Sequence, residues 1–232
     1  MNQVILITGA RKGIGKYLAE YFSDKGFTVF GCSRESVDYS LPNYKHYCCD
    51  VIKETQVKNM LRDIKETKGH IDILINNAGV NFTLQPTMLV SYQNALKTVE
   101  INLLGTFLMS REVAKLMMKN SFGRIINFSS MAVKHEVEGE AIYTASKAAI
   151  ISFTRVLAKE IYSFGITCNV ISPSAIKTDL MSGIDENALN NVLSRNAVKT
   201  KGKMEDISNT VDWLIKLESE AITGQVIYLG GV

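Results

Sequence analysis

Tyr143 and Lys147 lie four residues apart in the stretch Tyr-Thr-Ala-Ser-Lys. Apolar residues recur at helical spacing through this segment, so the two side chains are neighbours on one face of the predicted helix. An ammonium beside a phenol favours the phenolate that remains after proton donation, which makes the pair a candidate proton donor. The alternative is an ordinary surface pair on a solvated helix. Other residues must decide between these two interpretations.

A glycine-rich turn, Thr8-Gly-Ala-Arg-Lys-Gly-Ile-Gly15, directly follows the first apolar run of the chain. Glycine at positions 9, 13 and 15 permits a tight turn and a close approach of the backbone to a pyrophosphate. The N-terminus of the next helix would offer free N–H groups to the same anion. Such a turn can be only a turn, but its position between the first predicted strand and helix favours a nucleotide site.

Length and composition are those of one soluble α/β domain covering residues 1–232, with 46% hydrophobic and 21% charged residues. The net charge of +3 is small and the basic residues are spread along the chain, which predicts no nucleic-acid and no membrane partner. The four cysteines and three histidines lack the spacing of a zinc site, so no metal is expected. Reduced thiols without a signal peptide or a membrane-spanning segment predict a cytoplasmic protein.

Short apolar, β-branched runs alternate with longer helical patterns along the whole chain. The predicted strands are Val4–Ile7, Thr28–Cys32, His46–Cys49, Ile71–Ile75, Arg124–Phe128, Thr167–Ile171 and Val226–Leu229. The predicted helices are Ile14–Lys25, Glu54–Lys68, Tyr92–Lys119, Ala141–Phe164 and Met204–Leu217. This alternation predicts a doubly wound (Rossmann) parallel sheet, mainly of seven strands, with helices on both faces.

Two segments interrupt the alternation. Between Arg34 and Lys45 there is room for a loop or a single turn, but not for a crossover helix. Between Asp179 and Lys203, scattered apolar residues occupy an otherwise polar stretch. We interpret residues 179–203 as a substrate-binding lid, and a pair of ordinary surface helices is the alternative.

Taken together, the motifs resemble those of the short-chain dehydrogenase/reductase family, closest to its 3-oxoacyl-acyl-carrier-protein reductase-like members. The motifs occur in the family's order: Thr8–Gly15, Asp50-Val51, Asn76-Asn-Ala-Gly79, Asn102, Ser129-Ser130 and Tyr143-x-x-x-Lys147. The resemblance runs from Val4 to Gly231. It implies a single Rossmann domain that transfers a hydride between a nicotinamide cofactor and a carbonyl or alcohol.

By this resemblance, a set of residues would bind the cofactor. They are Thr8, Gly9, Arg11, Lys12, Gly13, Ile14, Gly15, Ser33, Arg34, Asp50, Val51, Asn76, Ala78, Gly79, Tyr143, Lys147, Pro173, Ile176 and Thr178. Asp50 and Val51 would contact the adenine, and Ile176 and Thr178 the nicotinamide carboxamide. Ser174 replaces the family's usual glycine, so a left-handed backbone there would be strained.

The predicted cofactor is NADP(H). In the family, an acidic residue at the tip of the second strand selects NAD, and here Ser33 occupies that place and Arg34 follows it. A guanidinium can bind a 2′-phosphate that a carboxylate would repel. Lys12 and Arg11 would add positive charge nearby. NAD(H) stays open because Glu35 could instead bind the ribose hydroxyls.

The same resemblance assigns catalytic roles. Tyr143 would be the general acid in reduction and the base in oxidation, and Ser130, thirteen residues upstream, would bond the substrate oxygen. Lys147 would bond the nicotinamide ribose and stabilise the phenolate. Asn102 would hold a relay water, or it is only a buried residue at a helix bend. We interpret the loop charges between Ser130 and Tyr143 as solvated; they are His135, Glu136, Glu138 and Glu140.

The predicted function is NADPH-dependent reduction of a carbonyl, favouring a 3-oxoacyl-acyl-carrier-protein-like substrate of fatty acid biosynthesis. The first alternative is an NAD(P)-dependent dehydrogenase of a sugar, polyol or other secondary alcohol. A non-catalytic NADP-binding sensor is less favoured, because such proteins commonly lose the tyrosine or the lysine. The expected partners are a small-molecule or carrier-bound carbonyl substrate and further copies of the chain, as a homodimer or homotetramer.

Overall fold

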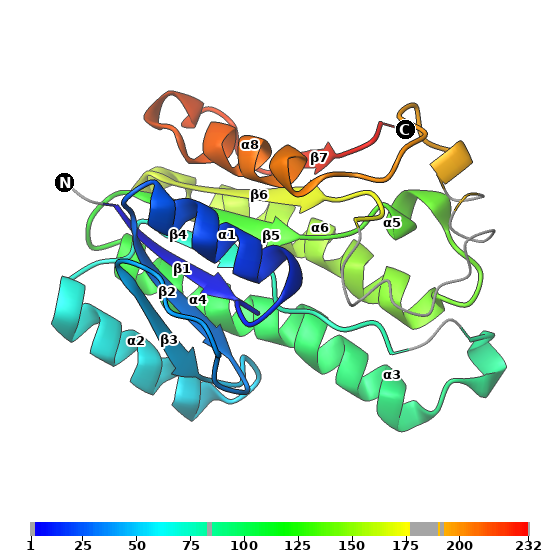
Figure 1. Cartoon of the computed structure of the whole chain (residues 1–232), viewed down its shortest axis with the longest axis horizontal. Helices are drawn as coiled ribbons and strands as arrows, with labels where there is room; N and C mark the ends of the chain where they lie inside the picture. Colours follow the sequence, from blue (N-terminus) through cyan, green and yellow to red (C-terminus); the bar gives the residue numbers. More distant parts are fainter. Residues whose placement is uncertain (1–2, 83–84, 177–189, 191–192, 232) are drawn as a thin grey trace.

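Seven parallel strands form one sheet in the order β3-β2-β1-β4-β5-β6-β7 (Figure 1). The structure is a computed structural model that describes residues 3–82, 85–176, 190 and 193–231. The strands are β1 (Val4–Thr8), β2 (Thr28–Ser33), β3 (Tyr44–Cys48), β4 (Ile73–Asn76), β5 (Gly123–Phe128), β6 (Ile166–Ser172) and β7 (Val226–Tyr228). This topology confirms the predicted doubly wound sheet.

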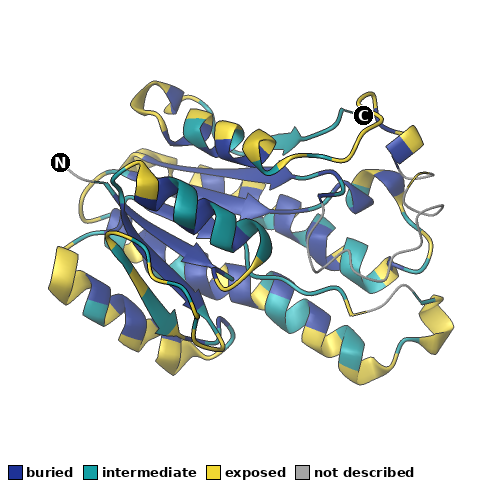
Figure 2. Ribbon diagram, in the orientation of Figure 1, coloured by how far each residue is buried: buried dark blue, intermediate teal, exposed yellow. Residues whose placement is uncertain are grey.

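Helices cover both faces of the sheet (Figure 1). The main helices are α1 (Gly13–Asp24), α2 (Glu54–Lys68), α3 (Tyr92–Val99), α4 (Gly105–Met117), α5 (Ala132–His135), α6 (Ala141–Ile161) and α8 (Met204–Ile215). Apolar residues of α1 and α8 pack on one face, and those of α2, α4 and α6 pack on the other. The central strands are therefore buried on both sides, as Figure 2 shows.

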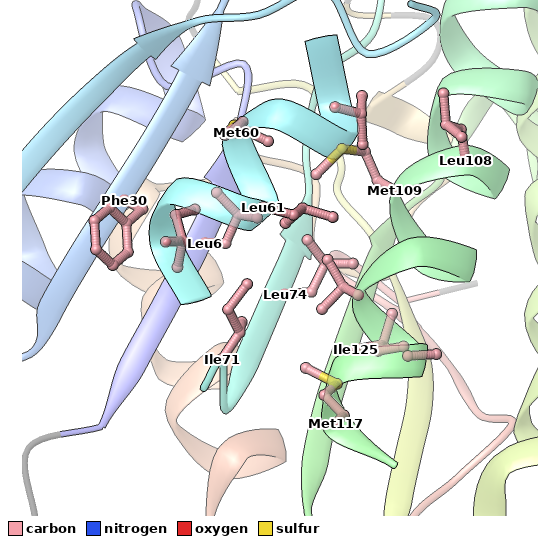
Figure 3. Close-up of a cluster of buried hydrophobic side chains, with 14 of the residues drawn as sticks. Leu6, Phe30, Met60, Leu61, Ile71, Leu74, Leu108, Met109, Met117 and Ile125 are labelled. Atoms are coloured by element: carbon pink, nitrogen blue, oxygen red, sulfur yellow. The ribbon is translucent and has the colours of Figure 1, made fainter. Parts of the chain in front are cut away.

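Alternation along β1 divides the core between these two layers. Leu6 points into the cluster beneath α2 and α4, which Figure 3 shows, whereas Ile5 and Ile7 point into the cluster beneath α1 and α8. All three side chains are fully buried. Each such side chain contributes roughly 1.5–3 kcal/mol through burial. The strands that carry the site residues at their ends are thus fixed by apolar packing.

The predicted helix Tyr92–Lys119 is not continuous. It consists of α3, a π-helical turn over Glu100–Leu104, and α4. Within the π turn, the Asn102 side chain is buried and bonds the backbone of Val80 instead of facing solvent. A π turn inserts one residue into the helical repeat and often occurs at functional sites. Helical periodicity continues on both sides of such a turn, so sequence patterns do not reveal it.

Smaller differences lie at element ends. Helix α6 stops at Ile161 and continues as the 3₁₀ turn Tyr162–Phe164, and the predicted end of the last helix becomes the 3₁₀ turn Leu217–Ser219. The connection between β2 and β3 contains no helix, as predicted. Of the predicted lid 179–203, residues 179–189 and 191–192 lie outside the described residues.

Candidate active site

A cavity of about 580 Å³ lies where parallel strands of the sheet end at their carboxyl side, which is where doubly wound proteins bind ligands. Most of the predicted site residues line it. They are Gly9, Arg11, Lys12, Gly13, Ile14, Ser33, Arg34, Asp50, Val51, Ala78, Gly79, Ser130, Tyr143, Lys147, Pro173 and Ile176. We call the part around Ser130, Tyr143 and Lys147 the catalytic end, and the part around Arg11, Arg34 and Glu35 the adenosine end.

The glycine turn is held against the end of β4. The Thr8 hydroxyl oxygen accepts hydrogen bonds from the backbone N–H groups of Asn77 and Ala78, both at 3.0 Å. Gly9 has a φ of +68°, and a Cβ there would lie 2.9 Å from the Ala78 Cα. A Cβ on Gly15 would lie 2.3 Å from the Gly9 carbonyl oxygen. Thr8 and Gly15 therefore act by shaping the turn, and only glycine fits at Gly9 and Gly15.

The geometry corrects the expectation for Asn76. Its buried side chain donates hydrogen bonds to the Ser110 hydroxyl and to the Asn127 amide oxygen, both at 2.8 Å, between the sheet and α4. The next residue, Asn77, lines the cavity and donates to the Thr8 carbonyl at 3.0 Å. The sequence contains two adjacent asparagines at a strand end, where side chains alternate between faces, so the strand register decides which one faces the cavity.

The catalytic end is assembled from the end of β5 and from α6. The Ser129 hydroxyl donates to the Lys147 carbonyl at 2.9 Å, whereas the Ser130 hydroxyl accepts from the Ala132 N–H at 3.1 Å and lies close enough to Tyr143 to oppose the rise that burial causes in the pKa of the phenol. Ser129 therefore fastens α6 to the strand end, and Ser130 is the serine beside the phenol. The Lys147 ammonium donates to the Phe128 carbonyl at 3.0 Å and lies 5.9 Å from the centre of the Tyr143 ring.

Burial controls the ionisation of both groups. It raises the pKa of Tyr143 to about 12; the hydrogen bond from Ser130 opposes this shift, and the charge of Glu140 adds to it. Burial lowers the pKa of Lys147 to about 8. The phenol is thus protonated throughout the neutral range and can donate a proton. The ammonium is charged at neutral pH and loses its charge at moderately alkaline pH.

Asn102 joins the π turn to the catalytic helix. Its amide oxygen accepts from the Val80 N–H at 2.8 Å, and its amide nitrogen donates to the Val80 carbonyl and the Ser146 hydroxyl, both at 3.0 Å. A Cβ on Gly79 would lie 3.2 Å from the Lys147 nitrogen and 3.3 Å from the Asn102 amide oxygen. The missing side chain of Gly79 therefore leaves space between these two groups. The relay role of Asn102 stays a prediction.

Two of the four loop charges are not solvated, which corrects that interpretation. Glu140 is 8% exposed, lines the cavity and accepts a hydrogen bond of 2.6 Å from the Asn81 amide. Burial raises the pKa of Glu140, with the Asn81 bond opposing. His135 is buried and bonds the Asn196 amide oxygen at 2.7 Å. Asn81 and Glu140 are site residues that sequence reasoning missed, although Glu140 precedes Tyr143 by only three positions.

The loop after β6 carries no strain at Ser174, which lies outside the left-handed region. Its hydroxyl accepts a hydrogen bond of 2.9 Å from the Asn196 amide, so serine fixes this loop to the segment that returns from residue 190. Ile176 lines the cavity and forms a parallel bridge with Gly202. Thr178 lies outside the described residues.

The adenosine end carries exposed charges. Arg11 and Glu35 form an ion pair of 2.9 Å, and their side chains are 47% and 63% exposed. Arg34 is exposed and lines the cavity beside them. Asp50 and Val51 also line the cavity: the Asp50 carboxylate accepts from the Ile52 N–H at 3.3 Å, and Val51 is buried against Gly105.

These residues fit a dinucleotide. The bare backbone at Gly9 and Gly13 opens onto the cavity beside the N-terminus of α1, which suits a pyrophosphate, and the adenosine end offers cations. Among the residues that the structure describes, no group of histidines, cysteines and acids is placed to hold a metal ion. No described helix has the length and apolarity needed to cross a bilayer.

Comparison with known proteins agrees with this geometry. A family profile described as Enoyl-(Acyl carrier protein) reductase matches residues 9–231. The 3-oxoacyl-acyl-carrier-protein reductase FabG of Escherichia coli (strain K12) is 32% identical, over 99% of this chain and 96% of the relative. The chain belongs to the short-chain dehydrogenase/reductase family of oxidoreductases.

Two solved structures resemble the fold closely over their whole length. ElxO with NADP bound has a TM-score of 0.90 and 29% identity, covering 99% of this chain and 97% of that one. A 4-hydroxyisoleucine dehydrogenase complexed with NADH has a TM-score of 0.87 and 31% identity, covering 99% and 98%. Similar chains thus occur with either nicotinamide cofactor.

Proposed function

We propose that this protein is an NADPH-dependent reductase of a carbonyl group, with a 3-oxoacyl-acyl-carrier-protein-like substrate favoured. The observation that carries the proposal is the catalytic end itself, where a protonated Tyr143 lies beside Ser130 and one helical turn from a desolvated lysine. Family membership supports the reaction class, and the FabG relatives support the substrate class.

Ser130 and Tyr143 act together on the substrate oxygen. Because Ser130 and Tyr143 line the same part of the cavity, a carbonyl oxygen between their hydroxyls would receive one hydrogen bond from each. Tyr143 then donates its proton as negative charge develops on that oxygen, and the Lys147 charge favours the phenolate left behind. Bound NADPH supplies the hydride chemistry. In the reverse direction the phenolate accepts the proton.

The preference for NADP(H) is supported by the charges at the adenosine end. Arg34 is exposed and lines the cavity, and the residue before it at the tip of β2 is Ser33, which carries no carboxylate. A 2′-phosphate would gain charge-assisted hydrogen bonds there. NADP in the ElxO structure agrees with this preference. The Arg11–Glu35 ion pair opposes the preference for NADP(H), because the Glu35 carboxylate already neutralises the Arg11 guanidinium.

A carrier-bound substrate is supported by basic residues near the end of the segment that follows β6. Lys199, Lys201 and Lys203 are exposed there and would attract an acidic carrier. Residues 179–203 would cover the substrate as a lid. Further copies of the chain would pack on α4 and α6, where Phe107 and Val156 are exposed by 40% and 54%. We expect a cytoplasmic homodimer or homotetramer.

A second candidate is a dehydrogenase of a sugar, polyol or other secondary alcohol. The polar pair Asn81–Glu140 in the cavity wall favours it, because a buried carboxyl and amide suit a substrate with additional hydroxyl groups. The alkyl chain of an acyl substrate would leave those groups without new partners.

A substrate screen followed by NAD(P)H absorbance tests the proposal. Acetoacetyl and longer 3-oxoacyl thioesters, hydroxy-ketones and polyols are offered with each cofactor in both directions. The expected result is the highest kcat/KM for a 3-oxoacyl thioester with NADPH. A higher kcat/KM for polyols with NAD⁺ would replace the first function by the second. NADPH binding without turnover of any compound would favour a sensor.

A further inference from the structure

A chain of hydrogen-bonding side chains connects the tip of β2 to the glycine turn. The Nε2 atom of His46, on β3, lies 2.8 Å from the Ser33 hydroxyl and 3.2 Å from the Glu35 carbonyl. Its Nδ1 atom lies 2.7 Å from the Tyr44 hydroxyl, which lies 3.1 Å from the Tyr39 hydroxyl. Tyr39 donates to the carbonyl of Ala10 in the glycine turn.

This chain joins two walls of the adenosine end. Ser33 and Glu35 line the cavity, and Ala10 lies between the cavity residues Gly9 and Arg11. Gly31 makes the connection possible, because a Cβ there would lie 2.1 Å from the Tyr44 hydroxyl oxygen. Gly31 is also the register partner of His46 in the sheet.

Counting protons shows that a neutral His46 cannot complete the chain. A carbonyl oxygen can only accept hydrogen bonds, so the Tyr39 hydroxyl must donate its hydrogen to the Ala10 carbonyl. If Nε2 carries the single imidazole proton, Nδ1 accepts a hydrogen bond from the Tyr44 hydroxyl. No hydrogen then lies between the Tyr44 and Tyr39 oxygens. If Nδ1 carries the single imidazole proton, the Ser33 hydroxyl donates its hydrogen bond to Nε2. The Glu35 carbonyl then has a donor neither in Ser33 nor in His46. The first tautomer leaves the Tyr44–Tyr39 contact without a hydrogen, and the second leaves both contacts to the Glu35 carbonyl without one.

The imidazolium supplies a hydrogen to every contact, provided that Nε2–H is shared between the Ser33 hydroxyl and the Glu35 carbonyl. Nε2–H donates to Ser33, which donates to the Glu35 carbonyl at 2.6 Å. Nδ1–H donates to Tyr44, whose own proton is then free to reach Tyr39. We propose that His46 is a positioning residue for the 2′-phosphate of the cofactor, and that its protonated form locks the tip of β2 to the glycine turn and adds positive charge behind Ser33. This inference rests on the proposed NADP(H) preference.

In the free protein, the surroundings favour the neutral imidazole. Burial lowers the pKa of His46, and its hydrogen bond to the Glu35 carbonyl opposes the shift. Burial raises the pKa of Tyr39 and of Tyr44, so both remain hydroxyl groups. The charged groups around the chain are Lys16 and Glu20 on α1, Asp38 and the Arg11–Glu35 pair in the loops, and Arg34. Asp63 of α2 bonds Lys45 and Tyr47, which alternate with His46 along β3 and so point to its other face.

A phosphate dianion beside Ser33 would favour the charged imidazole. By thermodynamic linkage, a ligand that binds more tightly to the protein with protonated His46 also raises the pKa of His46. Binding of a 2′-phosphate should therefore raise the pKa of His46, and protonation of His46 should tighten binding by the same factor, about fivefold or more.

The test uses adenosine 2′,5′-bisphosphate and adenosine 5′-monophosphate, which differ only in the 2′-phosphate. Nitrogen NMR of the intact protein follows the three histidines against pH, and His46→Gln identifies the His46 signal. We expect the bisphosphate, but not the monophosphate, to raise the pKa of His46. The phosphate itself titrates near pH 6, so its own effect on binding must be subtracted. The control is the pH dependence of the bisphosphate affinity of His46→Gln, measured by calorimetry.

Tyr44→Phe is the matched variant, because it keeps the imidazole and removes the relay hydroxyl. Without an acceptor for Nδ1–H, the pKa of His46 in the free protein should fall, with thermal melting checking the fold. An unchanged pKa of His46 in Tyr44→Phe would overturn the proposed hydrogen-bond chain through Tyr44. Tighter binding of the bisphosphate without any response of His46 would overturn the inference and leave the NADP(H) preference intact. Equal binding of both nucleotides at every pH would overturn both.

Discussion

The two ends of the cavity hold their charged groups in opposite ways. At the catalytic end, Lys147 is 5% exposed, and burial alone changes its pKa to about 8. At the adenosine end, the side chains of Arg11 and Glu35 are 47% and 63% exposed and meet as a surface ion pair. Desolvation makes a buried charge responsive to every neighbour, whereas salt and water screen an exposed pair.

The two ends of the cavity would therefore determine different properties of the enzyme. The proton chemistry depends on groups held by the core, since Ser129 and Phe128 anchor the catalytic helix to β5. The choice between the two cofactors would depend on exposed charges whose individual contributions are small. Substitutions at the catalytic end should therefore change turnover by large factors, and those at the adenosine end should change cofactor binding by small ones.

The largest effect is expected from Tyr143→Phe. Among the residues that the structure describes, Tyr143 carries the hydroxyl proton placed to reach a substrate oxygen together with Ser130, so its loss should lower kcat about 10³-fold or more. The dissociation constant for NADPH, measured by fluorescence titration, should change less than about threefold, because the ring remains. Tyr162→Phe, at a half-exposed tyrosine beyond the end of α6, is the matched control and should keep full activity. Substantial residual turnover in Tyr143→Phe would remove the catalytic end from the mechanism.

The second effect separates the ends by pH. Lys147 is charged below its pKa of about 8 and neutral above it, so the phenolate loses its stabilising charge as pH rises. The kcat/KM for carbonyl reduction should be level at neutral pH and fall about tenfold per pH unit above that value. In Lys147→Arg, the charge persists at alkaline pH, and any remaining activity should lose this fall. The same fall in that variant would assign the titration to another group.

The sequence was sufficient for the sheet and the catalytic end for a physical reason. Apolar strand runs and the helical spacing of Tyr143 and Lys147 are local patterns, and each side chain's direction follows from its element. The assignment of Ser130 came instead from the resemblance to the family's motifs. Contacts between distant segments were not predictable. The Asn81–Glu140 hydrogen bond joins residues 59 positions apart, and the choice between Asn76 and Asn77 depended on the strand register. The network of His46 likewise required Gly31, whose register only the assembled sheet reveals.

The smallest effects are expected at the adenosine end. Arg34→Ala should raise the KM for NADPH about tenfold, the value of one charge-assisted contact, with little change for NADH. Glu35→Gln should act oppositely: it releases Arg11 from its ion pair and removes a repelling charge, lowering the KM for NADPH about twofold to fivefold.

Both changes at the adenosine end should shrink as salt is raised, because the charges involved are exposed. The kcat at saturating cofactor should remain that of the unchanged protein, measured by NADPH absorbance in parallel. Glu35 would be the ribose-binding group if Glu35→Gln instead raised the KM for NADH and left NADPH unaffected. In that case the exposed carboxylate, rather than the exposed guanidinium, sets the cofactor choice, and the adenosine end selects NAD.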